Sequence, residues 1–247
     1  MLDENNNPRK FKRNEAILNG LMVRMTKLQI GLLDQACQDR RELAEIFLRC
    51  LAETFINLKY LLSNKTDKVF EDYIEYSLRE EKRLFIKVNN NISERGYSLP
   101  IEDRIKKSIE KAFKSSSFTF EQVNANSWKP WGEKIFERAK KVRMEEIYFG
   151  LFSMPSHSVH GNWQDLISHH LEYDDKVGDF FPNSNWSHIR PQLLYSPTLI
   201  STDINKLYLE KMMPECPDRK KLILLLDDIQ KRVLLVDKLH EEYLQNN

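Results

Sequence analysis

Apolar residues recur at steps of three and four along most of the chain, which is the spacing of one face of an α-helix. The clearest run lies between Asp39 and Leu62, where the apolar positions form a broad arc around the helix. A narrow polar stripe that includes Glu42, Arg49 and Glu53 lies opposite this arc. Because an arc of this width needs neighbours on several sides, the pattern predicts a central helix.

The same periodicity predicts helices along the rest of the chain. Their approximate ranges are 14–37, 66–89, 100–113, 133–142, 144–154, 165–170, 201–212 and 217–243. The segment 171–197 carries three prolines among polar and aromatic residues and predicts one long irregular loop. No internal repeat, heptad pattern or strand pattern is convincing. We therefore expect an all-α, single-domain bundle of about eight helices.

The first residues of the chain do not share this periodicity. Residues 1–13 are polar and basic, with Pro8 beside three asparagines. Segments of this kind remain solvated when nothing fixes them, so we expect residues 1–13 to form a flexible basic tail. The helical bundle domain is then expected to occupy residues 14–247.

One stretch, from Tyr148 to Trp163, departs from the helical pattern in the middle of the chain. It contains three serines, two histidines, an asparagine and a tryptophan around one proline and two glycines, in a chain with only seven glycines. Groups that transfer protons or form hydrogen bonds are therefore concentrated in one place. We expect this stretch and the stripe that carries Arg49 and Glu53 to line one pocket.

His160 is the first candidate for a general base or acid, because imidazole titrates near neutral pH. Cleavage of RNA by its own 2′-hydroxyl needs a base, an acid and a cation beside the phosphate. His160, His157 and Arg49 supply these three roles, with Glu53 in support, if the helices converge. The alternative is structural: His160 bonds a neighbouring helix, Gly161 supplies a turn, and Arg49 and Glu53 form a surface ion pair.

Four other residues of the stretch are candidates for contacts with a substrate. Ser156 and Asn162 offer hydrogen-bonding groups, and the rings of Tyr148 and Trp163 could stack on bases. Aromatic residues in loops are equally often packed into the core. The prediction therefore depends on whether these side chains face solvent.

A metal site is a second chemical option. His157 and His160 lie three residues apart, and Asp165, His169 and His170 follow closely. The spacing is not diagnostic, because adjacent histidines point in different directions on a helix and no second carboxylate cluster lies nearby. The chain also lacks the Gly-x-Ser-x-Gly motif of serine hydrolases and any phosphate-binding glycine loop. We therefore expect neither a metal nor a cofactor.

Charge and cysteine content restrict the class of protein further. The formal net charge of +1 provides no global field for nucleic acid or membrane, so RNA would have to bind a local patch. Cys37, Cys50 and Cys216 are odd in number and lack ligand spacing, which argues against a disulfide framework and a zinc site. No signal-peptide core and no apolar run of about 18 residues is present. We expect a cytoplasmic protein that does not enter a membrane.

The motifs Arg49-x-x-x-Glu53, then Tyr148, then Ser156-x-x-x-His160-Gly161 resemble those of a bacterial family of helical proteins. That family is catalogued as a domain of unknown function and is numbered in the five thousand six hundreds. The resemblance covers most of the chain, from about residue 15 to 245, although only these few positions carry it. It implies a helical bundle and gives no activity.

A looser resemblance is to the HEPN superfamily, whose helical bundles include many RNases of toxin–antitoxin and phage-defence systems. The HEPN signature is an arginine followed by four to six residues and a histidine. No arginine stands at that spacing here, and Ser156 occupies a comparable place before His160. The relation is therefore an analogy of fold and context.

Two functional hypotheses follow from these residues. The first is a bacterial cytoplasmic protein that cleaves or binds RNA in a defence or toxin role, as a metal-independent ribonuclease-like phosphodiesterase, with His160 at its centre. The second is a non-catalytic helical interaction or scaffold protein in which the polar cluster only holds helices together. RNA is the expected partner in the first case, and a protein partner or a homodimer is a further expectation.

Overall fold

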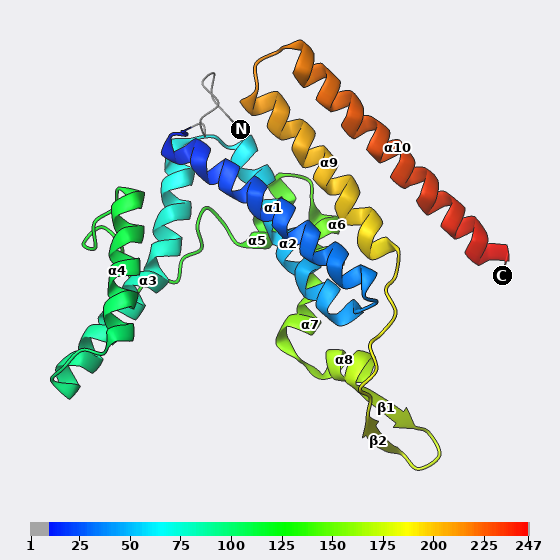
Figure 1. Ribbon diagram of the computed structural model, residues 1–247, viewed down its shortest axis with the longest axis horizontal. Helices are drawn as coiled ribbons and strands as arrows, with labels where there is room; N and C mark the ends of the chain where they lie inside the picture. Colours follow the sequence, from blue (N-terminus) through cyan, green and yellow to red (C-terminus); the bar gives the residue numbers. More distant parts are fainter. Residues whose placement is uncertain (1–9, 247) are drawn as a thin grey trace. The chain divides into compact units, whose positions relative to one another are not determined.

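A computed structural model describes residues 10–246 of the chain (Figure 1). Within that range the chain forms ten α-helices, two short π-helical segments and two strands, so the prediction of an all-α fold is confirmed. Most of the predicted tail, residues 1–13, lies outside the described residues, and the first helix begins at Arg13. The chain folds into two compact units, which the periodicity of the sequence did not separate.

Of the described residues, the first unit contains 10–16 and 64–134 and is built on a helical hairpin of α3 (Asp67–Arg95) and α4 (Pro100–Ser116). Thr66 and Pro100 lie at the starts of these two helices, as the sequence predicts. The Thr66 side chain forms no capping hydrogen bond. The predicted end of α3 at residue 89 was wrong. Helix α3 continues to Arg95 because Gly96, at φ 83°, provides the left-handed residue that ends it.

Aromatic packing and main-chain hydrogen bonds hold the irregular segment 117–134 on this hairpin. The Phe120 ring stacks on Phe113 at 3.9 Å, beside the buried Ile109. Lys82 Nζ donates to the carbonyls of Phe120 and Val123 at 2.5 and 2.9 Å. The segment is therefore held by contacts with both α3 and α4 rather than by secondary structure of its own.

Of the described residues, the second unit contains 17–63 and 135–246, and α2 (Arg41–Ser63) is its central helix. Leu48, Leu51, Phe55 and Leu58 of α2 are completely buried, as the broad apolar arc predicts. Helices α5 (Ile135–Lys141) and α9 (Gln192–Met212), the π-helical segment η1 (Tyr148–Ser153) and α7 (Ser156–His160) all pack on α2. Helix α2 is thus the element on which the other parts of the unit are placed.

The remaining elements of the second unit are α1 (Arg13–Cys37), most of which belongs here, α6 (Glu145–Ile147), α8 (Trp163–Asp165), the π-helical segment η2 (Leu166–His170) and α10 (Pro217–Asn246). Side-chain hydrogen bonds tie α1 to its neighbours. Arg24 Nε donates to Thr54 Oγ1 at 3.2 Å, and Tyr208 Oη donates to Asn19 Oδ1 at 2.6 Å. Helix α10 packs along α9, as Figure 1 shows.

The predicted loop 171–197 was partly wrong. Strands β1 (Leu171–Asp174) and β2 (Asp179–Pro182) form an antiparallel hairpin, in which Leu171 pairs with Pro182. Two four-residue strands are too short for a periodic signal, which is why the sequence did not reveal them. The predicted start of the next helix at residue 201 was also wrong, because α9 begins at Gln192 and contains the buried Pro197.

Candidate functional site

Arg49 joins the central helix to the stretch that the sequence singled out. Its Nε donates to Ser156 Oγ at 3.0 Å, and its NH1 donates to Glu53 Oε2 at 2.9 Å. The Ser156 hydroxyl donates in turn to the Phe152 carbonyl at 2.6 Å. Arg49, Glu53 and Ser156 therefore meet, as expected, and form one hydrogen-bonded link between α2 and α7.

Aromatic residues of η1 complete this link. The Arg49 guanidinium lies 3.3 Å from the centre of the Phe152 ring, and the Tyr148 ring stacks on Phe152 at 5.1 Å. A guanidinium stacked on a ring is stabilised by the negative face of the π-system. The Arg49 side chain is thus occupied on three sides, and Tyr148 supports it through Phe152.

Gly161 and Asn162 shape the end of α7. Gly161, at φ 56°, adopts the left-handed conformation that ends α7. Asn162 then caps α8, since its Oδ1 accepts from the Asp165 amide at 3.2 Å. Because Oδ1 accepts this hydrogen bond, it is the side-chain NH2 group of Asn162 that faces His157. Asn162 Nδ2 lies 2.6 Å from His157 Nδ1. His157 therefore accepts through Nδ1 and carries its proton on Nε2.

The structure does not bring His160 to the Arg49–Glu53 pair. His160 is exposed at the end of α7, and among the described residues it makes no hydrogen bond or ion pair. Trp163 is also exposed and lies edge-on to Phe180 of the hairpin, with the ring centres 5.5 Å apart. His160 lies one helical turn beyond Ser156, at the last residue of the five-residue α7, so it extends past the point at which Ser156 meets Arg49.

A second polar cluster, which the sequence did not reveal, lies at the start of α2. Glu42, Glu45 and His169 are all more than nine-tenths buried. His169 Nδ1 lies 2.8 Å from Ser187 Oγ and 3.5 Å from Glu42 Oε1, and its Nε2 lies 3.7 Å from Glu45 Oε2. The imidazole of His169 is therefore held between two carboxylates that come from one helix.

Further hydrogen bonds connect this cluster to α7. Glu45 accepts from Arg41 Nε at 2.8 Å and from Ser158 Oγ at 2.8 Å. Ser158 lies two residues from Ser156, so α7 is held to α2 at two successive points of the polar face. A signal for Glu45 was present in the sequence, because Glu42, Glu45 and Arg49 follow each other at helical spacing.

Two carboxylate oxygens of the region have no partner within residues 10–246. One is Glu42 Oε2 and the other is Asp165 Oδ1, both buried. The other oxygen of Asp165 lies 3.3 Å from His170 Nε2. Buried acceptors without a partner are uncommon in native proteins and tend to mark sites where water or a ligand completes the bonding.

A cavity of about 500 Å³ opens beside these groups. Its charged and imidazole lining is supplied by Arg41, Glu45, His157, Asp165, His169 and Arg190. Ser158, Ser168 and Gln192 add hydroxyl and amide groups. Arg49, Glu53 and His160 do not line it, so the polar cavity lies one to two helical turns along α2 from the pair that the sequence favoured.

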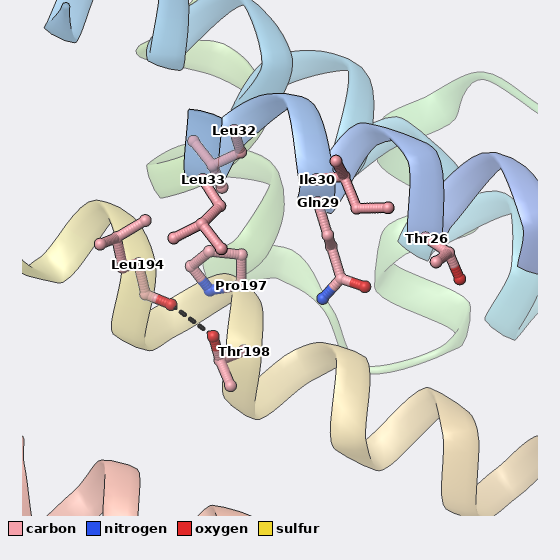
Figure 2. A pocket seen from close by; sticks show the side chains of 8 residues that line it. All are labelled: Thr26, Gln29, Ile30, Leu32, Leu33, Leu194, Pro197 and Thr198. Atoms are coloured by element: carbon pink, nitrogen blue, oxygen red, sulfur yellow. Dashed lines mark hydrogen bonds between the residues drawn. The ribbon is translucent and has the colours of Figure 1, made fainter. Parts of the chain in front are cut away.

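A second hollow, of about 360 Å³, lies between α1 and α9 (Figure 2). Ile30, Leu32, Leu33, Leu194 and Pro197 form most of its wall. Figure 2 shows the Gln29 side chain reaching from α1 toward α9, on which Thr198 lies. No charged or imidazole side chain lines it. Of these two hollows, it is therefore the cavity beside α2 and α7 that has charged and imidazole side chains in its wall.

The ligand groups of the region do not form a metal centre in this conformation. Within residues 10–246, no set of three or more histidine, cysteine, aspartate or glutamate side chains has the arrangement that a metal ion needs. His169 and His170 diverge, since one contacts Glu42 and the other Asp165. Over the same range no helix combines the length and the apolar character required to cross a membrane.

Fold and site together define an all-α protein in which a buried, charged face of one central helix meets a polar turn and a cavity. The chain belongs to the family of unknown function DUF5677, whose model matches residues 15–178. The match includes α2, α7, α8 and η2, and with them most of the polar lining of the cavity. No curated protein and no solved structure shows detectable similarity to the chain.

Proposed function

We propose that the cavity beside α2 and α7 binds RNA and cleaves it by metal-independent acid–base chemistry. The observation that carries the proposal is that two imidazoles, those of His157 and His169, line the same cavity. The Nδ1 of His157 accepts from Asn162, which leaves an N–H on Nε2. A proton on Nδ1 of His169 would be shared with Ser187 and Glu42. Nε2, which lies 3.7 Å from Glu45 Oε2 and so beyond hydrogen-bond distance, would then be the acceptor.

These roles match the reaction in which RNA is cleaved by its own 2′-hydroxyl. His169 Nε2 would take the proton of the 2′-hydroxyl as its oxygen attacks phosphorus. His157 Nε2 would donate a proton to the departing 5′-oxygen. The products are a 2′,3′-cyclic phosphate and a free 5′-hydroxyl, so the atoms balance without water in this step. Ser187 and Glu42 would then orient His169.

Arg190 supplies the third requirement, a cation beside the phosphate. Its side chain is exposed at the cavity, and within residues 10–246 its guanidinium has no hydrogen-bond or ion-pair partner. Arg41 also lines the cavity but already binds Glu45. A free guanidinium is suited to bidentate binding of a phosphodiester. In this arrangement Arg49 and Glu53 position α7, and His160 stays at the exposed end of the helix.

The assay uses the purified full chain and single-stranded RNA oligonucleotides, with a chelator present throughout. His157→Ala is expected to reduce cleavage at least 100-fold without changing the melting temperature, because His157 is exposed and bonds only Asn162. His160→Ala is the matched control on the same helix and is expected to retain activity. Absence of cleavage by the unaltered chain, or full activity of His157→Ala, would refute the assignment.

Arg190→Ala separates binding from chemistry in the same assay. Loss of a phosphate contact should raise KM, and should lower the salt dependence of RNA binding. The toxin or phage-defence role in a bacterial cytoplasm belongs to the same proposal. Expression of the chain in bacteria is then expected to slow growth, and His157→Ala should relieve the effect. Unimpaired growth with the active chain would contradict that role.

The second candidate function is a helical interaction protein without catalysis. The contacts of Arg49 favour this second candidate. The Arg49 guanidinium bonds Glu53 and Ser156 and stacks on Phe152. All of these contacts stabilise the fold. In this case His157→Ala and Arg190→Ala leave every measured property unchanged, and no RNA product appears.

A further inference from the structure

Another cavity, of about 400 Å³, lies toward the end of α2 and is called the α9 pocket below. It opens between α2, the turn that joins α5 to α6, and α9. Lys59 lines it and lies about 20 Å further along α2 than Glu45 of the cavity beside α7. The two cavities share no lining residue, so a molecule bound in the α9 pocket does not occupy the proposed RNA site.

Apolar side chains form half of the wall of the α9 pocket. They are Met144, Ile147, Ile200, Ile204 and Leu207. Met144 and Ile204 are buried, and the three α9 residues follow each other at steps of four and three, so they lie on one face of that helix. A pocket of this size with an apolar wall is suited to the apolar body of a small organic molecule.

Two charged side chains of the α9 pocket are already bonded to α10. The Gln230 amide donates to Asp203 Oδ1 at 2.5 Å. Lys206 Nζ lies 2.5 Å from Asp227 Oδ1 and also donates to Gln230. Asp203 and Lys206 therefore hold α9 to α10, and their charges are balanced within the fold.

The other charged side chains of the α9 pocket are Lys59, Arg143 and Glu210. Among the described residues, none of these three side chains has a hydrogen-bond or ion-pair partner. Lys59 is partly buried, where its charge is less screened by solvent, whereas Glu210 is exposed. The two cations outnumber the carboxylate, so the pocket favours a negatively charged group.

The backbone of Arg143 gives a second, independent observation. Its φ of 55° is in the left-handed region, which strains residues other than glycine. The Arg143 amide donates to the Lys140 carbonyl at 3.1 Å and the Met144 amide to the Ala139 carbonyl at 2.9 Å, the pattern that ends many helices with a glycine. Strained residues cluster at ligand sites. The turn itself favours glycine, so the side chain of Arg143, which lines the pocket, is what distinguishes this residue.

We propose that the α9 pocket binds a small organic anion with an apolar body. Lys59 and Arg143 hold its negatively charged head, and Ile204 and Leu207 contact its body. A guanidinium binds a carboxylate or a phosphate monoester through two parallel hydrogen bonds, so both heads share the required chemistry. The proposal does not rest on any cleavage of RNA.

Isothermal titration calorimetry of the full chain with octanoate, octyl phosphate and octylammonium, each below its micellar concentration, tests this ligand class. At least one of the two anions is expected to bind ten or more times tighter than octylammonium, which has the same chain and the opposite charge. Inorganic phosphate should bind at least tenfold more weakly than the tighter octyl anion, because it has no apolar body. Absence of binding by both octyl anions, or equal binding of octylammonium or inorganic phosphate, would overturn the proposal.

Variants of the pocket separate binding from folding. Arg143→Gly removes the guanidinium but gives the turn its favoured residue, so it should weaken binding of the tighter octyl anion at least tenfold without lowering the melting temperature. Lys59→Gln should weaken binding similarly, whereas Glu210→Gln should not weaken it. Lys140→Gln is the matched control, because it removes a positive charge from α5 outside the pocket. A lower melting temperature with unchanged affinity in Arg143→Gly would assign Arg143 a structural role only.

Methyl NMR spectra of the chain labelled at methionine locate the bound anion. Met144 lines the α9 pocket, and its signal is identified by its loss in Met144→Leu. The Met144 signal should shift as the tighter octyl anion is added. Met25, buried on α1 and outside the pocket, should keep its position. An unshifted Met144 signal in the presence of saturating anion would place the binding elsewhere and overturn the assignment.

Discussion

Nε of Arg49 lies 3.0 Å from Oγ of Ser156, although 107 residues separate them in the sequence. This hydrogen bond links the charged face of the central helix to the polar turn of residues 148–163. It places both pieces in one unit of the fold, and the cavity with His157 and His169 lies beside them.

Arg49→Ala is expected to lower the free energy of unfolding by about 1–3 kcal/mol, because it leaves the Ser156 and Glu53 groups without their charged partner. Chemical denaturation measures the change. Lys68→Ala removes another i,i+4 ion pair, with Asp72, from an exposed helix face, and should change stability by less than about 1 kcal/mol. Equal effects of the two substitutions would show that the Arg49 link contributes no more than a surface pair.

Asn162→Asp is expected to change the tautomer of His157 while keeping the helix cap. The aspartate oxygen can still accept from the Asp165 amide, but it replaces the N–H that faces Nδ1 of His157 with an acceptor. The His157 proton should then move from Nε2 to Nδ1, which ¹⁵N chemical shifts of the ring report directly. Loss of RNA cleavage should accompany the change. An unaltered ring spectrum would mean that Asn162 does not orient His157.

Gly31→Ala is expected to destabilise the packing of α1 on α2. A Cβ at this position would overlap the ring of Phe47, which must then move. Overpacking of this kind typically costs about 1–3 kcal/mol. Gly20→Ala is the control on the same helix, where a Cβ meets nothing and the substitution should stabilise by about 0.5–1 kcal/mol. Thermal unfolding of both variants gives the sign, and a stabilised Gly31→Ala protein would contradict the contact.

Asp39 is expected to make the stability of the second unit depend on pH in the acidic range. The Ile189 amide donates to its Oδ1 at 2.8 Å and His188 bonds Oδ2, which together hold the pKa of Asp39 below its ordinary value. The stabilisation is therefore present above about pH 4 and is lost as the pH falls through the lowered pKa of the folded state. Asp39→Asn should remove this part of the pH profile of the denaturation midpoint. An unchanged profile below pH 4 would refute the assignment.

Asp39 also connects the fold to the proposed site. Its contacts fix residues 188 and 189, directly before Arg190 at the cavity. Asp39 itself has a positive φ of 54°, which asparagine tolerates, so the substitution tests charge rather than backbone strain. Under the proposed function, Asp39→Asn should raise KM for RNA by mobilising Arg190, with little change in kcat.

The sequence by itself determined the helical character of the protein and the central place of α2. Both depend on the spacing of apolar residues such as Leu48, Leu51 and Phe55, which is local information that a 3.6-residue period expresses directly. It also identified Arg49, Glu53 and Ser156, because unusual polar groups stand out from an apolar pattern. The capping glycine Gly161 was recognised in the same way.

Only the tertiary structure decided which polar residues share a cavity. Glu45 and His169 lie 124 positions apart and come together because α7 and η2 fold back on the first turns of α2, a relation that no local spacing encodes. The exposure of His160 likewise follows from the length of α7, which Gly161 limits to five residues. Periodicity fixes which face of a helix is polar, but the direction of each connecting turn determines what that face meets.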